Sequence, residues 1–159
     1  MKTKRRKGFT LMELVFATAA GTIVIVAAGI IMFVGHTSWN RAWRKVNLQR
    51  DAAYAMFIIS RSIREGTSAK LENDGRELWL YTDEGWMRFH VVLGADKLQL
   101  KCEKEIETTA QNLVTILDDK VEDLQFNVEG NKVTIALKLN KDGMQTHSVS
   151  TVMMRNYGG

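Results

Sequence analysis

The strongest pattern in the chain is an apolar run of 21 residues near its start. Residues 14–34 contain no charged side chain and consist mostly of Val, Ile, Ala, Phe and Gly. A helix of this length covers about 32 Å, close to the hydrocarbon thickness of a bilayer. A helix on the surface of a soluble core would carry a polar stripe, which this run lacks. The pattern therefore predicts a membrane-spanning helix.

An amphipathic pattern follows the apolar run without a break. Between residues 37 and 64, apolar side chains recur mostly every three or four positions, and charged side chains fill much of the remainder. The recurring apolar residues are Trp39, Trp43, Val46, Ala53, Met56, Ile59 and Ile63. We therefore expect one long helix over residues 9–65, with a membrane-spanning half at 9–35 and an amphipathic half at 36–65. Gly66 supplies a stop signal for this helix.

Residues 66–159 alternate between apolar and polar positions, as half-buried strands do. The expected strands are 77–82, 86–93, 97–103, 121–129, 132–140 and 144–155, with turns rich in Gly, Asn and Asp between most of them. Residues 112–117 fit either a short strand or a helical turn. The expected core face consists of Leu78, Leu80, Leu98, Leu100, Leu124, Phe126, Val128, Val133, Ile135, Leu137 and Leu139. The fold class predicted is α+β, a long helix packed on one or two antiparallel sheets.

Basic residues crowd the segment before the apolar run. Five of the 22 Lys and Arg residues lie within residues 1–8, and all 18 acidic residues come later. The positive-inside rule then keeps the N-terminus in the cytoplasm and sends the β-rich head across the membrane. Without residues 1–8 the formal net charge changes from +4 to −1. A head with this charge argues against nucleic acid as a partner.

One carboxylate, Glu13, stands at the start of the apolar run. A charged group inside a membrane helix costs about 3 kcal/mol on insertion scales and usually has a partner and a function; the alternative is a side chain that reaches the headgroups. Ala17 and Gly21 lie four residues apart, which suits close helix packing but is also ordinary membrane-helix composition. An ordinary secretory signal would have a shorter apolar run ending in a small-residue cleavage site.

Residues 7–14, KGFTLMEL, resemble the processing signal of type IV prepilins and type II secretion pseudopilins. The resemblance covers about the first 35 residues and implies a pilin-like fold. It implies that residues 1–8 are a leader, removed by a prepilin peptidase that cuts between Gly8 and Phe9 and methylates the new amine of Phe9. It also implies that Glu13 meets the N-terminal amine of a neighbouring subunit during filament assembly.

The resemblance implies a place and a set of partners as well. These are the bacterial inner membrane with a single span, a periplasmic or extracellular head, membrane lipid, other pilin or pseudopilin subunits, the peptidase and the inner-membrane assembly platform. The implied function is a minor subunit at or near the tip of a type II secretion pseudopilus or a type IV pilus. Residues 116–126, ILDDKVEDLQF, with the hairpin after them, are similar to J-type minor pseudopilins and W-type minor pilins. The K-type tip subunit typically lacks the glutamate found here at position 13.

Residues capable of catalysis or metal binding are scattered. His36, His90 and His147 show no zinc spacing, and Cys102, the single cysteine, allows no internal disulfide. We expect no metal, no cofactor and no enzymatic activity. The alternatives are a minor pilin whose head binds DNA or a surface, and a membrane-tethered enzyme with an uncleaved anchor.

Two further groups in the head have a functional and a structural interpretation. The acidic run Asp118, Asp119, Glu122 and Asp123 could offer oxygen ligands to Ca²⁺, but it lacks the glycine-punctuated spacing of a calcium loop and is expected to be a solvated acidic turn. Three aromatic residues on alternating strands could form a binding face or belong to the core and the sheet surface. They are Trp79, Trp86 and Phe89.

Overall fold

The computed structural model describes residues 10–94, 98–104 and 112–155. Gly8 and Phe9, at which processing is predicted, lie outside this part of the chain. The chain divides into two compact units, Met1–Trp43 and Arg44–Gly159. A single helix, α1 (Leu11–Glu65, 55 residues), supplies most of the first unit and begins the second. The long helix expected from the sequence is therefore confirmed.

In the first unit, none of the described residues is buried. Large apolar side chains between Leu11 and Val34 are exposed, for example Ile31 at 73% and Phe33 at 72%. Exposed apolar surface is unfavourable in water by about 25 cal/mol per Å². The described residues leave this part of α1 uncovered, and an apolar environment outside the chain would stabilise it.

In the second unit, one face of α1 packs on the sheet. The buried side chains of this face are Leu48, Ala52, Ala55, Met56, Ile59 and Ile63. The predicted stripe was right for Met56, Ile59 and Ile63 but wrong for Ala53 and Val46, which are exposed. The helix ends where expected, because the Gly66 N–H donates to the Ile63 carbonyl at 3.2 Å and the chain then turns into the sheet.

Trp39 and Trp43, which the predicted stripe also included, belong to the first unit and are exposed at 69% and 58%. Periodicity alone could not separate them from the buried positions further along, because all of these residues are apolar and share the same helical spacing.

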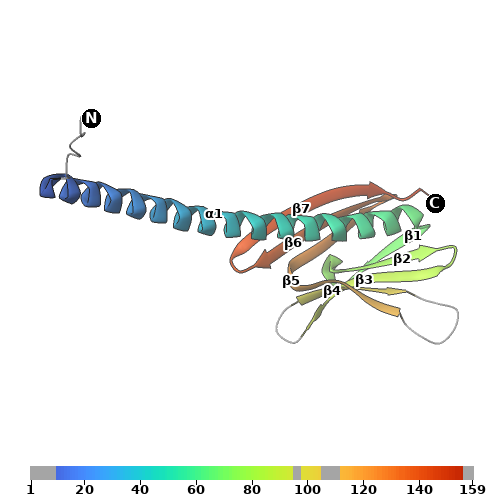
Figure 1. The fold of residues 1–159 in the computed structure, drawn as a ribbon. Coiled ribbons are helices and arrows are strands. Elements are labelled where there is room, and N and C mark those ends of the chain that lie inside the picture. The colour runs from blue at the N-terminus through green and yellow to red at the C-terminus, as the bar shows by residue number, and fades with distance from the viewer. Residues whose placement is uncertain (1–9, 95–97, 105–111, 156–159) are drawn as a thin grey trace, which may run out of the picture. The chain divides into compact units, whose positions relative to one another are not determined.

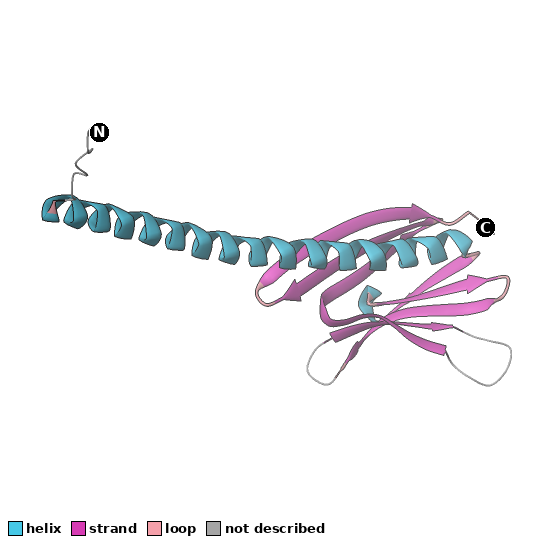
Figure 2. Ribbon diagram, in the orientation of Figure 1, coloured by secondary structure: helices cyan, strands magenta, loops and turns pink. Residues whose placement is uncertain are grey.

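In the described part of the head, seven strands form one curled antiparallel sheet in chain order (Figure 1 and Figure 2). The strands are β1 (Ser68–Glu72), β2 (Glu77–Thr82), β3 (Gly85–Leu93), β4 (Leu98–Lys104), β5 (Asn112–Glu129), β6 (Lys132–Lys141) and β7 (Met144–Met153). A 3₁₀ turn, η1 (Asn73–Gly75), links β1 to β2. The α+β class, the pilin-like arrangement of helix and sheet, and the meander of β2, β3 and β4 are thus as predicted.

Two strands differ from the prediction. β1 was not predicted, and residues 112–117 form the start of β5, which continues for 18 residues. The acidic run lies inside β5 rather than in a turn, so that prediction was wrong. The strand is nevertheless irregular at the acidic run, because Asp119 has a φ of 55° and the pairing with β6 shifts between Val121 and Asp123. Aspartate tolerates this left-handed conformation better than most residues.

The core lies between the sheet and the second half of α1. Nine of the eleven predicted core residues are buried, and Leu98 and Val128 are partly buried against the same cluster. The sequence-based list omitted Phe89, which is fully buried in β3. Gly75 brings η1 against β5, because a Cβ at this position would lie 2.7 Å from the Phe126 carbonyl oxygen. Its φ of +81° also favours glycine.

Candidate functional site

The first turn of α1 holds the predicted assembly residue, Glu13, in a reciprocal cap with Thr10. The backbone N–H and the hydroxyl of Thr10 both donate to Glu13 Oε2, at 2.9 and 3.0 Å. In return, the Glu13 N–H donates to Thr10 Oγ1 at 3.3 Å. This is a capping box, in which Thr10 is the N-cap and Glu13 the third helical residue. The sequence signal was present as Thr-x-x-Glu, and the interpretation of Glu13 as a charge inside the membrane overlooked it.

Position also favours a carboxylate here. The first turn of a helix exposes unpaired N–H groups and carries a partial positive charge, which stabilises a negative side chain. Glu13 is the only acidic residue in the first turn of α1. The same side chain can therefore cap its own helix and accept a hydrogen bond from an ammonium group that approaches the helix start.

The segment after Glu13 satisfies its polar groups internally. Each of three threonine hydroxyls donates to a backbone carbonyl of the preceding turn: Thr18 to Val15 at 2.9 Å, Thr22 to Ala19 at 2.8 Å and Thr37 to Val34 at 2.9 Å. With this arrangement a threonine hydroxyl can lie in the hydrocarbon core of a bilayer without leaving its hydrogen-bond donor unpaired. By length and composition, α1 is long and apolar enough to cross a membrane.

Among residues 10–94, 98–104 and 112–155, no side chain packs against the glycines of this segment. A Cβ added at Gly21 or Gly29 would meet no atom within 4 Å. Glycine lowers helix stability by about 1 kcal/mol relative to alanine in a helix interior. The absence of side chains at these positions therefore leaves open surface that another helix could approach.

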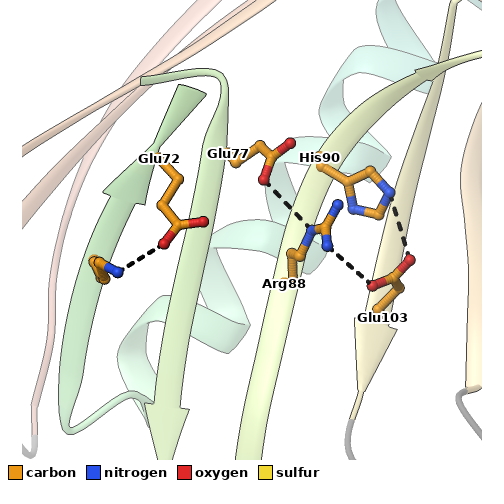
Figure 3. Close-up of polar contacts among 6 residues, drawn as sticks. Glu72, Glu77, Arg88, His90 and Glu103 are labelled. Carbon is orange, nitrogen blue, oxygen red and sulfur yellow. Dashed lines mark hydrogen bonds and ion pairs between the residues drawn. The ribbon is translucent and has the colours of Figure 1, made fainter. Parts of the chain in front are cut away.

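A second group of polar side chains lies on the face of the sheet opposite α1 (Figure 3). Arg88 on β3 reaches Glu77 on β2 at 3.6 Å and Glu103 on β4 at 3.7 Å. The Arg88 guanidinium also lies 5.2 Å from the ring centroid of Trp79. Trp79 and Trp86 contact each other with centroids 4.9 Å apart. Trp79 and Trp86 thus belong to the sheet surface and Phe89 to the core, so these three aromatic residues do not form one binding face.

His90 is the most buried polar residue of this group, with 4% of its surface exposed. Its Nε2 lies 3.6 Å from Glu103 Oε1, and its Nδ1 is buried without a hydrogen-bond partner. Burial lowers the pKa of His90, and the nearby Arg88 charge lowers it further, while Glu103 opposes both effects. These surroundings favour the neutral form of His90.

The other candidate ligands are not brought together. His36 contacts Asn40 within α1, at 3.0 Å, and His147 lies on exposed β7. Burial raises the pKa of the partly buried Cys102 thiol to about 11, so this thiol is a poor nucleophile at neutral pH. Within residues 10–94, 98–104 and 112–155, no three His, Cys, Asp or Glu side chains could hold a metal ion together.

The acidic run of β5 is engaged by neighbouring side chains. Glu122 accepts hydrogen bonds from Lys138, and from Gln145 at 3.1 Å. Asp118 accepts one from Gln99 at 2.6 Å. The adjacent Lys120 donates to Asp51 and so ties β5 to α1. These carboxylates are thus spread along the strand and do not converge on one point.

A comparison of the sequence with protein-family models and with curated proteins finds no match. Functional inference therefore depends on the chain itself: the string at residues 7–14, the uncovered apolar half of α1 and the position of Glu13 at its first turn.

Proposed function

We propose that the chain is a membrane-anchored, pilin-like assembly subunit, processed between Gly8 and Phe9 and incorporated into a filament of the pseudopilus or pilus type. In this function the apolar half of α1 first holds the subunit in the inner membrane and then packs among the helices of other subunits. The head projects from the membrane on the side away from the basic leader. The residues similar to J-type and W-type subunits favour a minor subunit near the filament tip.

The observation that carries this proposal is a fully uncovered apolar helix segment whose single ionisable group sits in its first turn. A membrane anchor alone needs the apolar side chains, and its helix cap needs only a hydrogen-bond acceptor at position 13, whereas pairing with an ammonium group needs the negative charge of Glu13. The open surfaces at Gly21 and Gly29 also suit helix–helix contact rather than lipid contact alone.

Processing gives Glu13 a partner. Cleavage after Gly8 creates an ammonium group at Phe9, four residues before Glu13. An ammonium and a carboxylate in an apolar medium are each costly alone, so a subunit that joins the filament in the wrong axial position would leave both unpaired. The pair therefore favours one stagger between neighbouring subunits.

The proposal is tested by the intact mass of the full chain, expressed with and without a prepilin peptidase. We expect the peptidase to remove eight residues and to add one methyl group. Gly8→Ala should block this change because a Cβ obstructs the approach of the peptidase to the backbone. Gly21→Ala, in open surface of the helix, is the matched control and should be processed normally.

An unchanged mass in the presence of an active peptidase would contradict the proposal. So would equal processing of the wild-type chain and Gly8→Ala, because cleavage would then not depend on the predicted glycine.

A further inference from the structure

Three arginine side chains line a cavity of about 490 Å³ at the C-terminal end of α1, within the second unit. Arg61 and Arg64 come from the end of the helix, and Arg155 follows β7. The backbone N–H of Arg155 donates to the Arg64 carbonyl at 3.4 Å and so holds the two ends together (Figure 1). The other described residues that line the cavity are Phe57, Ser60 and Glu65.

The cavity carries more positive than negative charge. Glu65, its one carboxylate among the described residues, pairs with Arg61 at 3.2 Å. Within the described part of the chain, neither Arg64 nor Arg155 forms an ion pair. Three guanidinium groups and one carboxylate leave a net charge of +2. The partial negative charge of the helix end accounts for a cation in the last turn, at Arg64, but not for Arg155, which lies outside the helix.

The chemistry and the shape of the cavity restrict its ligand. Guanidinium groups suit carboxylates and phosphates, because their planar forks donate two parallel hydrogen bonds to such anions. The cavity is open to solvent, since the side chains of Arg61 and Glu65 are 71% and 56% exposed. Small-molecule sites instead bury most of the surface of their ligand. An open, basic cavity therefore suits acidic side chains that another macromolecule presents.

Exposed aromatic side chains extend the cavity along α1. Tyr54, Phe57, Arg61 and Arg64 follow one another at steps of three or four residues, so they share one side of the helix, opposite the side that packs on the sheet. Tyr54 is 58% exposed and Phe57 is 64% exposed. Residues 46–69 contain arginine but no lysine. Protein interfaces are enriched in Tyr, Phe and Arg and depleted in Lys, so this composition indicates a surface for protein contact.

We propose that this arginine–aromatic surface binds an acidic segment of a different subunit, and this proposal rests on the function proposed above. Carboxylates of the segment pair with Arg64 and Arg155, and an apolar side chain beside them covers Phe57. The surface consists of Tyr54, Phe57, Arg61, Arg64 and Arg155.

Two other occupants fit this surface less well. Nucleic acid would require many cations along its phosphate backbone, whereas the chain beyond residue 8 has 17 basic and 18 acidic residues. A second copy has few carboxylates to offer, because eight acidic side chains of its described residues already form ion pairs within the chain.

The first test measures how charge affects the native complex. The full chain is produced in the source organism and extracted from its membranes in mild detergent, and its complex is quantified on a native gel. The double variant Arg64→Gln with Arg155→Gln should lower the amount of complex at least about tenfold, because the carboxylates of the partner lose their cations. Lys45→Gln with Lys141→Gln removes two exposed charges elsewhere and should leave the complex unchanged.

Phe57→Ala tests the apolar part of the surface. Because this side chain is exposed, its truncation should leave the fold intact. We expect about tenfold less complex, since aromatic side chains at the centre of an interface supply much of the affinity. Val149→Ala shortens a side chain that is 58% exposed on β7 and should assemble as the wild type does.

Arg64→Lys identifies the occupant, because a carbodiimide can join the introduced amine to an adjacent carboxylate while the positive charge is retained. We expect mass spectrometry to find position 64 joined to an Asp or Glu of another subunit. A cross-link to a second copy, cross-links only within the chain, or none at this position would overturn the proposal. So would loss of the complex after nuclease treatment, because nucleic acid would then be the occupant.

The outcomes for the surface and for the proposed function can be distinguished. A complex that survives both the double arginine variant and Phe57→Ala, with melting temperatures close to wild type, would overturn the surface proposal. If Gly8→Ala nevertheless abolishes that complex, the assembly function stands without this surface. A wild-type chain that never migrates above its monomer position would overturn both proposals together.

Discussion

The carboxylate oxygens of Glu13 have two possible roles. In the isolated chain the carboxylate caps its own helix through Thr10. In an assembled subunit the same oxygens would accept hydrogen bonds from a neighbouring ammonium group. The roles differ in what they require, because a cap needs a hydrogen-bond acceptor, whereas pairing across subunits needs a negative charge.

Glu13→Gln separates these roles. Glutamine can serve at this position of a capping box but carries no charge. We expect both Glu13→Gln and Glu13→Ala to insert in the membrane and then to fail to enter the filament. Thr10→Ala removes the cap, at about 1 kcal/mol, but keeps the charge, so it should still assemble. The measurement is the fraction of the chain in sheared filaments; normal incorporation of Glu13→Gln would refute the charge-pairing role.

His90 makes stability depend on pH. Burial lowers the pKa of His90 in the folded chain, so the unfolded chain binds a proton at a higher pH than the folded chain does. Stability is therefore greatest above the unfolded pKa of about 6.5 and falls as the pH drops below it. Besides burial, which has the largest effect, Arg88 and Lys101 lower this pKa, while Glu103 and Glu77 raise it.

We expect the free energy of unfolding of the full chain in micelles to fall between pH 7.5 and pH 5.5, and to fall less for His90→Gln. Urea unfolding followed by near-ultraviolet circular dichroism measures both values. The range stays above the region where the lowered pKa values of Glu72 and Glu122 would contribute. Equal losses in the two proteins would show that His90 has the same pKa in the folded and unfolded chain.

At the scale of elements, the second half of α1 is fixed by a narrow buried face. The Ile59 side chain is fully buried on the face of α1 that packs on the sheet. Phe57, two residues earlier on the same helix, is 64% exposed. The number of apolar residues on this helix is thus a poor guide to which of them stabilise the head.

Ile59→Ala should lower the free energy of unfolding by about 2–5 kcal/mol, because it removes buried methyl groups and leaves a cavity. Phe57→Ala, on the same helix, should change it by about 0.5 kcal/mol or less. Thermal and urea unfolding of the full chain in micelles compare the two. Similar effects at both positions would contradict the packing described for α1.

The elements also show how far the sequence could predict the structure. Strong alternation located β2, β3 and β6 to within about one residue, because each has one buried and one solvated face. β1 was missed because its five residues, SAKLE, are too short and polar to show a period. β5 was divided because Asp118 and Asp119 look like a turn, whereas the strand accommodates them with one left-handed residue and a shift in register.

For the candidate site, the sequence located Glu13 but not the contacts that it makes. The capping hydrogen bonds depend only on local spacing and could have been found from Thr-x-x-Glu. The group around Arg88 could not, because its members come from three strands whose register decides which side chains meet.

At the scale of the whole chain, charge and apolar surface are strongly segregated. The first eight residues carry five positive charges, and the remaining chain has 17 basic and 18 acidic residues. The exposed large apolar side chains are concentrated between Leu11 and Val34, while the head buries most of its own. The chain thus runs from a basic segment through an apolar helix segment to a head with its own core, which is the order that the proposed function requires of a leader, an anchor and a folded domain.

The strand order has a kinetic consequence. Among the described residues, each of the seven strands pairs with its neighbour in the chain, so the strand order is sequential. Contacts between segments close in sequence need little loop closure, which favours rapid folding. Under the proposed function, in which the head crosses a membrane, the sheet can form hairpin by hairpin while later residues are still crossing, and β7 is the last strand to pair.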